Sequence, residues 1–298
     1  MDKIITKQYR KTFAIRPSGR STDFISPSFG HGCLYNCTYC YMKRHKNANL
    51  NIATNTEQIL TEINNHCAFT DVEKPNQTHD KFITYDISCN EDFALHAKHH
   101  KWEKIFDFFK YHPNAMGSLA TKYVNKELLK YNPNGKIRIR FSLMPEYYAD
   151  ILEPNTTPIL ERIKAIDKFI LAGYDVHINF SPVIVTGLWL DQYKLLFEQV
   201  NQHVNFKDNV KAEVIFLTHN EDKHLYNLKH KLPGENMLWK PKIQEAKESQ
   251  FGGKNIRYKH QLKSKYIQEF VNLHDQIIPW NIIRYCFNFL LILNLYGI

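Results

Sequence analysis

Strand-like and helix-like segments alternate along most of this 298-residue chain, and this alternation limits the folds open to it. Runs rich in β-branched and aromatic residues are separated by segments in which apolar residues recur every three or four positions. Strands are predicted at 24–26, 81–86, 118–121, 136–142, 175–180 and 211–217, and helices at 57–66, 102–111, 157–171 and 190–200. Such alternation is typical of α/β proteins with a parallel sheet. About six βα units predict a partial (β/α)6 TIM-type barrel, short of the eight units of a closed one.

Composition divides the chain into three predicted parts. Residues 1–22 form a basic segment, 23–235 the barrel, and 236–298 a basic C-terminal appendage that is less periodic and contains a probable β-hairpin. The strongly apolar tail from Tyr285 to Ile298 is shorter than the roughly 20 residues needed to cross a bilayer. We therefore expect a docked terminal segment and no membrane anchor.

The charge of the chain favours a polyanionic partner. The formal net charge is +9, and Lys and Arg are dense at the start of the chain and between residues 240 and 265. Neutralising phosphates releases condensed counterions, which suits a nucleic acid, although a solvated basic surface has the same composition. The cysteines outside the main motif are scattered, and Met1-Asp2-Lys3 opens no secretory signal, so we expect a reducing cytoplasm.

Three cysteines lie within the aromatic-rich segment from Gly32 to Tyr41. Cys33, Cys37 and Cys40 have the spacing C-x3-C-x2-C. Iron–sulfur clusters are normally held by four cysteines, so three leave one coordination position for water, substrate or a cofactor. An open position indicates chemistry rather than scaffolding. The alternative from the same residues is a Cys3His zinc site completed by His31 or His45.

Polar residues follow the ends of successive predicted strands. The cysteine segment follows the first strand, Ile87–Asp92 follows the second, Lys122 follows the third and Ser142 ends the fourth. In parallel barrels the loops at the carboxyl ends of the strands carry the chemistry, so we expect the active site there. Glu91 and Asp92 are also candidates for a helix N-cap, because carboxylates favour first turns.

Together these segments resemble the radical S-adenosylmethionine (SAM) superfamily and, within it, the spore photoproduct lyase family. Members of that family reverse a methylene-bridged thymine dimer in DNA. The resemblance covers roughly residues 25–235 and is carried by Gly32–Tyr41, Tyr85–Asp92, Thr121–Tyr123, Asn134–Ser142, Glu153-Pro154 and Ala172–Tyr174.

The resemblance implies a [4Fe-4S] cluster held by the three motif cysteines, with SAM on the fourth iron. One electron from a reducing protein such as flavodoxin or ferredoxin would cleave SAM and give a 5′-deoxyadenosyl radical. Cys89 matches the hydrogen-atom donor to the product radical. Tyr39 and Tyr41 match tyrosines that lie near SAM and pass a hydrogen atom.

The resemblance also implies SAM contacts. Asn90 or Glu91 would receive the methionyl ammonium, Lys122 would pair with the carboxylate, and Ser142 would donate to the same end. The family has small hydroxylic residues near the position of Glu91, so the chain departs from the pattern there.

A lesion inside a base stack must be extruded before it can react. The predicted hairpin of residues 249–260 offers Lys254, Arg257 and Tyr258 as contacts to DNA. The family has Arg-Tyr before the paired glycines of this hairpin, whereas this chain has Gln250-Phe251 before Gly252-Gly253, which leaves the lesion open.

Two other hypotheses remain. A radical SAM enzyme could act on RNA or another nucleic-acid component, and a non-catalytic zinc or iron–sulfur module could bind nucleic acid without cleaving SAM. The second leaves Glu91, Lys122 and Ser142 without a reason to lie at strand ends. The His-rich stretch 97–101 and the pair Tyr147-Tyr148 are interpreted as helix surface and packing, with solvated histidines.

Overall fold

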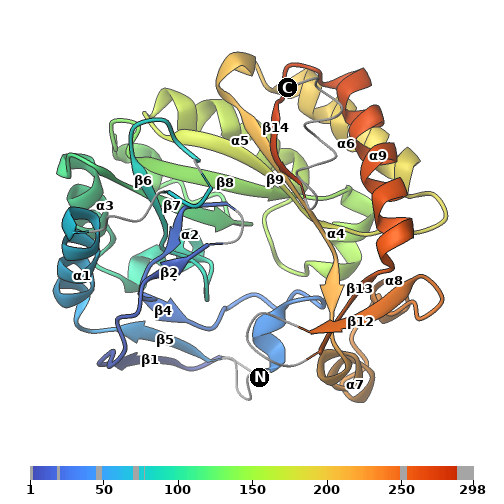
Figure 1. The fold of residues 1–298 in the computed structure, drawn as a ribbon, viewed down its shortest axis with the longest axis horizontal. Helices are drawn as coiled ribbons and strands as arrows, with labels where there is room; N and C mark the ends of the chain where they lie inside the picture. The colour runs from blue at the N-terminus through green and yellow to red at the C-terminus, as the bar shows by residue number, and fades with distance from the viewer. Residues whose placement is uncertain are drawn as a thin grey trace. The chain divides into compact units, whose positions relative to one another are not determined.

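The computed structural model describes residues 3–18, 21–44, 49–69, 74–76, 78–248 and 254–286, and it forms two compact units (Figure 1). The first unit comprises residues 1–34, 47–141 and 165–177, and the second comprises 35–46, 142–164 and 178–298. Strand β8 (Ile137–Leu143) begins in the first unit and ends in the second, as does β9 (Asp175–Val183). Helix α5 (Ile159–Leu171) begins in the second unit and ends in the first.

The first unit is built on a largely parallel sheet. Its strand order is β2-β3-β6-β7-β8, in which neighbours from β3 to β8 are parallel and β2 is antiparallel at the edge. The elements are β2 (Arg16–Pro17), β3 (Phe24–Ile25), β6 (Ile83–Asp86), β7 (Ala115–Thr121), α1 (Thr56–Phe69), α2 (Phe93–His96) and α3 (Trp102–Tyr111), with 3-10 turns η2 (Ala97–His99) and η3 (Leu128–Lys130). A second sheet has the order β1-β5-β4, formed by β1 (Ile5–Gln8), β5 (Leu50–Ala53) and β4 (Gly30–His31).

Apolar spacing explains why these segments fold as they do. Helix α1 buries Ile59, Leu60 and Ile63, and α3 buries Ile105, Phe106 and Phe109, which is the three-to-four-residue recurrence of one helix face. All seven residues of β8 are buried, as expected of a parallel strand covered on both sides. Phe24 of β3 is paired with Tyr85 of β6, so the segments that follow these two strands leave the same edge of the sheet.

The second unit contains β9 and its neighbours, a helical layer and a small antiparallel sheet. The strand order is β14-β10-β9, with β10 (Lys211–Phe216) and β14 (Ile283–Cys286) parallel. The small sheet has the order β11-β13-β12, formed by β11 (Thr218–His219), β13 (Lys254–Tyr258) and β12 (Gln244–Glu248). The helices are α4 (Glu146–Leu152), α6 (Trp189–His203), α7 (Glu221–Lys229), α8 (Glu235–Leu238) and α9 (His260–Ile277), with 3-10 turns η1 (Tyr41–Arg44) and η4 (Lys207–Asn209).

Aromatic rings form much of the core between α6 and α9. Phe197 and Phe270 lie 5.3 Å apart between ring centroids, and Phe180 of β9 lies 5.7 Å from Phe270. Edge-to-face contacts of this kind add to the free energy gained from burial. No helix within the described ranges combines the length and the apolar character needed to span a membrane.

The predicted α/β class is confirmed, and each predicted strand and helix overlaps an observed one. The strands flanking the predicted hairpin are β12 and β13, while its turn at 249–253 and the tail beyond Cys286 lie outside the described residues. The C-terminal part, predicted to be less periodic, contains the 18-residue helix α9, which the sequence analysis did not predict. Lys263 and His274 lie on the buried face of α9, and these polar residues break the apolar pattern.

Candidate active site

The first half of the cysteine segment takes its conformation from Gly32. This glycine has φ +104°, and a Cβ there would lie 2.1 Å from the carbonyl oxygen of Asn49, so only glycine fits. Its N–H donates to the carbonyl of Asn90 at 3.0 Å, and the Lys3 ammonium donates to the carbonyl of Cys33. Cys33 is half-buried, which leaves its thiol a path to an external group.

The second half of the segment is fixed through its backbone within the second unit. The Cys40 N–H donates to the Cys37 carbonyl at 3.1 Å, and the Thr38 N–H donates to the carbonyl of Leu152 in α4 at 2.8 Å. Cys37 is buried and Cys40 is half-buried. These backbone bonds hold the two thiols on a tight turn.

Helix α7 holds the carbonyl groups of the same turn. The Asn227 amide donates to the Thr38 carbonyl at 3.1 Å, and the Lys223 ammonium donates to the Tyr39 carbonyl. Because both side chains are buried, the cysteine turn is tied to α7 without intervening solvent.

The donor set of the motif fits an iron–sulfur cluster. All six cysteines of the chain are free of disulfides, so three thiols within eight residues remain available as ligands. Closely spaced thiolates are the ligands that such clusters prefer.

The two tyrosines of the motif have different surroundings. The Tyr39 hydroxyl donates to Glu153, and burial, with the neighbouring Glu153 charge, raises the pKa of Tyr39 well above its usual value. Arg162 pairs with the other oxygen of Glu153 at 2.8 Å. Tyr41 is 42% exposed. Tyr39 is therefore anchored by a buried ion pair, whereas the ring of Tyr41 is accessible.

Cys89 lies in the segment after β6, as predicted, and its environment keeps the thiol protonated. Burial, together with the Asp86 charge, raises the pKa of Cys89 to about 11, although a hydrogen bond with Arg16 opposes the shift. Asp86 is itself held by Arg140 at 2.8 Å. At neutral pH the group is S–H, the form that can give up a hydrogen atom.

Asp92 caps helix α2, as the sequence allowed. Its Oδ1 accepts from the Leu95 N–H at 3.2 Å and from the Thr121 hydroxyl at 2.7 Å, and its Oδ2 accepts from the Lys122 N–H at 2.9 Å. Lys122, at the end of β7, is half-buried. The cap therefore fixes the backbone of the lysine predicted to face the SAM carboxylate.

Glu91 is buried among histidines. Its side chain is 1% exposed, and its Oε2 accepts from His96 Nδ1 and His100 Nε2, each at 2.9 Å. The Leu34 N–H, next to Cys33, donates to His96 Nε2 at 3.2 Å. The expectation of solvated histidines was wrong for His100, whose side chain is 2% exposed, because it solvates this carboxylate in place of water.

The other two predicted SAM contacts lie in polar surroundings. The Asn90 amide donates to the Ser28 hydroxyl at 2.6 Å, within the first unit. Ser142 is buried in the second unit, where its carbonyl accepts from Arg162 at 2.8 Å and the amide of Asn179 lies 3.5 Å from its hydroxyl.

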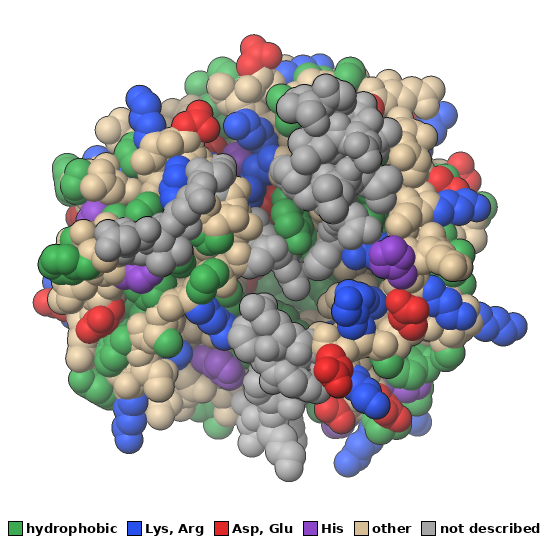
Figure 2. Space-filling view, viewed as in Figure 1, with side chains coloured by type: hydrophobic (Ala, Val, Ile, Leu, Met, Phe, Trp, Pro, Cys, Tyr) green, Lys and Arg blue, Asp and Glu red, His purple; other side chains and the backbone are tan. Residues whose placement is uncertain are grey.

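The predicted nucleic-acid residues differ in exposure. Lys254 is exposed and Arg257 is half-buried, but Tyr258 is 1% exposed and its hydroxyl accepts from the Val185 N–H at 2.8 Å. The predicted DNA contact of Tyr258 does not fit this placement, since the ring lies in the core. Figure 2 shows Lys and Arg side chains spread over one face, with Asp and Glu side chains among them.

Comparison with known proteins identifies relatives of one kind. The family model for spore photoproduct lyase matches residues 3–287. A spore photoproduct lyase of Bacillus subtilis (strain 168) is 28% identical over 64% of this chain and 55% of its own length. One of Geobacillus sp. (strain Y412MC61) is 24% identical over 67% of this chain and 57% of its own. The chain thus matches little more than half the length of these two relatives.

Solved structures support the fold. A spore photoproduct lyase variant with bound AdoMet and dinucleoside spore photoproduct superposes with a TM-score of 0.83, at 18% identity, over 95% of this chain and 82% of that one. Native anSMEcpe with bound AdoMet gives a TM-score of 0.51, at 12% identity, over 98% of this chain and 67% of the other. The predicted partial barrel of the radical SAM kind is confirmed.

Proposed function

Because the chain belongs to the spore photoproduct lyase family, we propose that it is a radical SAM lyase that reverses a thymine-dimer photolesion in DNA. The observation that carries this proposal is the protonated Cys89 thiol in the segment after β6. A hydrogen-atom donor at that position suits a reaction that ends by quenching a product radical.

Cys33, Cys37 and Cys40 would hold the [4Fe-4S] cluster. Bound there with SAM, the cluster would supply the electron that cleaves SAM and gives a 5′-deoxyadenosyl radical. The protein contributes the turn from Cys37 to Cys40 and the bonds from α4 and α7 that fix it.

Cys89 would return a hydrogen atom to the thymine radical. A thiol with a pKa near 11 is almost wholly protonated at neutral pH, so the S–H hydrogen is present in nearly every molecule. A thiolate at the same place could not do this. The Asp86 carboxylate and burial both favour the neutral form.

Exposure favours Tyr41 as the tyrosine that moves a hydrogen atom, because this residue is 42% exposed. Tyr39 donates its hydroxyl hydrogen to Glu153, so we assign it mainly to positioning the turn. Both residues stay in the proposed catalytic set.

Asn90, Lys122 and Ser142 remain the proposed SAM contacts. An amide, an ammonium and a hydroxyl suit the polar ends of SAM. Glu91 belongs to the same predicted set, but its carboxylate already accepts hydrogen bonds from two histidines. We therefore propose that Glu91 acts on SAM indirectly, by positioning the neighbouring backbone, where the Gly32 N–H donates to the Asn90 carbonyl.

DNA is the proposed polymer, with Lys254 and Arg257 as phosphate contacts. Such contacts set affinity and register without reading sequence. A reducing protein such as flavodoxin or ferredoxin as electron donor, and a cytoplasmic location, complete the proposal.

The direct test is a repair assay. The protein is reconstituted anaerobically with iron and sulfide, reduced with SAM and given an oligonucleotide that contains the spore photoproduct, while 5′-deoxyadenosine and restored thymidine are followed by chromatography. Cys89→Ala should still cleave SAM, but restored thymidine should fall or divert to adducts. Cys67→Ala, which removes another mostly buried thiol of the first unit, is the matched control and should repair normally.

Each other outcome is informative. SAM cleavage without repair of this lesion would contradict the proposed substrate and direct the search to RNA or another nucleic-acid component. A protein that binds iron and nucleic acid but never cleaves SAM would contradict the radical chemistry itself.

A further inference from the structure

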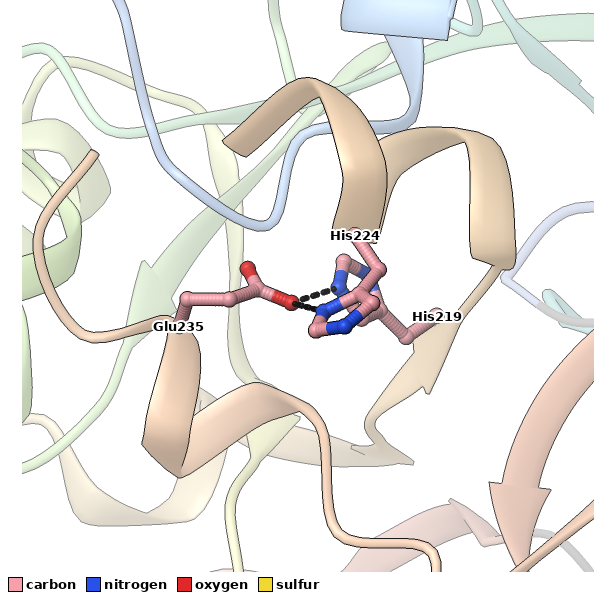
Figure 3. Close-up of side chains that lie close together, drawn as sticks. All are labelled: His219, His224 and Glu235. Carbon is pink, nitrogen blue, oxygen red and sulfur yellow. Dashed lines mark hydrogen bonds and ion pairs between the residues drawn. The ribbon is translucent and has the colours of Figure 1, made fainter. Parts of the chain in front are cut away.

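We propose that His219, His224 and Glu235 form a binding site for a divalent transition metal, with Zn²⁺ as the expected ion. One ligand atom from each of the three residues lies within 4.8 Å of the other two. Figure 3 shows both imidazoles turned toward the same carboxylate. None of the three residues belongs to the cysteine motif or to the proposed repair chemistry.

Local structure explains why the three side chains meet. His219 ends β11, and Asn220 caps α7 by accepting from the Lys223 N–H at 2.8 Å, so His224 lies in the first turn of the helix that follows. After α7 the chain turns back through Gly234, at φ +77°, and Glu235 begins α8. The capped start and the left-handed turn bring residues 16 positions apart together.

The three side chains are close enough to converge on one ion. Glu235 Oε1 lies at hydrogen-bond distance from both imidazoles, 2.9 Å from His219 Nε2 and 2.6 Å from His224 Nδ1. Tetrahedral bonds of about 2.0–2.2 Å to zinc place neighbouring donor atoms about 3.3–3.6 Å apart. Binding would therefore replace these hydrogen bonds and move the donor atoms apart by up to about 1 Å.

Neighbouring side chains orient the ligands. The Asn227 amide donates to Glu235 Oε2 at 2.5 Å, which leaves Oε1 for the histidine side. Trp239 stacks on the His224 ring with centroids 4.1 Å apart and planes 10° apart. Such supporting contacts commonly fix ligand orientation in metal sites.

One buried polar atom beside the cluster would gain a partner from a bound ion. Asn227 Oδ1 has no hydrogen-bond partner among the described residues, although Asn227 is fully buried. Buried polar atoms seldom remain unpaired, and a water bound to the ion would supply a donor. His219 Nδ1 also lacks a partner among the described residues, but it lies on the side of the ring away from Nε2, so the ion would not pair it.

The donor set selects the metal class. Imidazole nitrogen suits zinc and its transition-metal neighbours, whereas Mg²⁺ and Ca²⁺ prefer sites made wholly of oxygen. Three protein ligands leave a fourth tetrahedral position for water.

The position of the site suggests a stabilising role. His219 lies on β11, which pairs with β13, while Lys223 and Asn227 of α7 hold the turn of the cysteine segment. An ion shared by β11, α7 and α8 would tie these elements together within the second unit.

Cobalt titration of the full chain tests the site. The metal-free protein carries Cys33→Ala, Cys37→Ala and Cys40→Ala, so that the motif thiols cannot bind Co²⁺. One equivalent of Co²⁺ should bind with visible absorption bands of a tetrahedral site, and Zn²⁺ should displace it. Asn227→Leu should weaken binding about 10- to 100-fold, as loss of a supporting contact does.

Ligand variants decide the outcome. His219→Ala and Glu235→Gln should abolish saturable binding, while His230→Ala, an exposed histidine that follows α7, should bind like the parent. Glu235→Gln keeps the size and an acceptor oxygen, and circular dichroism will verify that it is folded. Absence of saturable Co²⁺ absorption in the parent, which is the protein with the three cysteine substitutions, would overturn the proposal. Unchanged Co²⁺ binding in Glu235→Gln would overturn it as well. Neither result depends on lesion repair.

Discussion

Each unit contains a glutamate that accepts hydrogen bonds from two histidines, but the two clusters are built differently. Glu91 accepts hydrogen bonds from His96 and His100 at one oxygen, while its Oε1 has no hydrogen-bond partner in the described part of the chain and is packed close to Gly30. The second nitrogen of His96 is used by the Leu34 N–H. Around Glu235, one ligand atom from each of the three residues lies within 4.8 Å of the other two.

The cluster at Glu235 has the same convergence of two histidines on one oxygen but differs in its other contacts, because its second oxygen accepts from Asn227. Its histidines converge on Oε1, and the second nitrogen of His219 has no partner among the described residues. Each cluster also holds backbone of the cysteine segment, through His96 to Leu34 in one case and through Asn227 to Thr38 in the other. One glutamate and two histidines thus make a hydrogen-bonded anchor in one unit and the proposed metal site in the other.

Replacing Glu91 with Ala should give the largest effect. Two buried histidines lose their shared acceptor, and each buried donor left without a partner costs about 1–3 kcal/mol of unfolding free energy. Urea unfolding measures the loss, with Glu103→Ala on exposed α3 surface as control. A loss no larger than that of the control would contradict the anchoring role of Glu91.

Stabilisation by zinc is the second largest expected effect, and it should distinguish the Glu235 cluster from the Glu91 cluster. An ion that binds only the folded protein stabilises it by about 2.7 kcal/mol at a hundredfold excess over Kd. With the motif cysteines replaced, Zn²⁺ should raise the thermal midpoint of the parent and of Glu91→Gln, but not of Glu235→Gln. Equal shifts in both glutamate variants would remove the distinction between the clusters.

Gly30→Ala should destabilise the cluster of Glu91, His96 and His100 through a steric clash. A Cβ at this position would lie 2.4 Å from Glu91 Oε1, and the carboxylate cannot yield while two histidines hold it. We expect a loss of about 1–3 kcal/mol, as for other overpacked sites. Gly187→Ala, with nothing within 4 Å of its Cβ, should unfold like the parent in the same urea titration. If both variants unfold at the same urea concentration as the parent, the carboxylate of Glu91 is not held in place by the two histidines.

The pH dependence of stability should show the smallest effect. Burial alone would raise the pKa of Glu91, but the charges and hydrogen bonds of His100 and His96 hold it below the usual 4.5. Because the folded-state pKa is depressed, this stability is present above about pH 4.5 and is lost as the pH falls below it, at about 1.4 kcal/mol for each pKa unit. Between pH 6 and pH 3, the free energy of unfolding should fall less steeply for Glu91→Gln than for the parent protein. A parallel curve would show that Glu91 gains nothing from its histidines.

Local patterns predicted what depends on local sequence. The βα alternation followed from apolar spacing, and the C-x3-C-x2-C motif needed only eight residues. The cap at Asp92 was also visible, because carboxylates favour first helical turns. Helix α9 was missed because two polar residues lie on its buried face.

Side-chain contacts that depend on irregular turns were not predicted from the sequence. His96 and His100 reach Glu91 across a short helix and a 3-10 turn, a spacing that no regular period reveals. The prediction for Tyr258 overlooked a simple rule, since adjacent residues of a strand face opposite sides and Arg257 and Tyr258 cannot share one surface. The domain boundaries at 22/23 and 235/236 stay predictions.

The most direct test of the proposed chemistry is the source of the hydrogen in the repaired thymine. In D2O the Cys89 thiol exchanges to S–D, so thymidine restored by the parent protein should carry a deuterium, detectable by mass spectrometry. Cys89→Ala should lose that label together with most of the restored thymidine. Thymidine restored by the parent without deuterium, or labelled equally in Cys89→Ala, would contradict Cys89 as the donor.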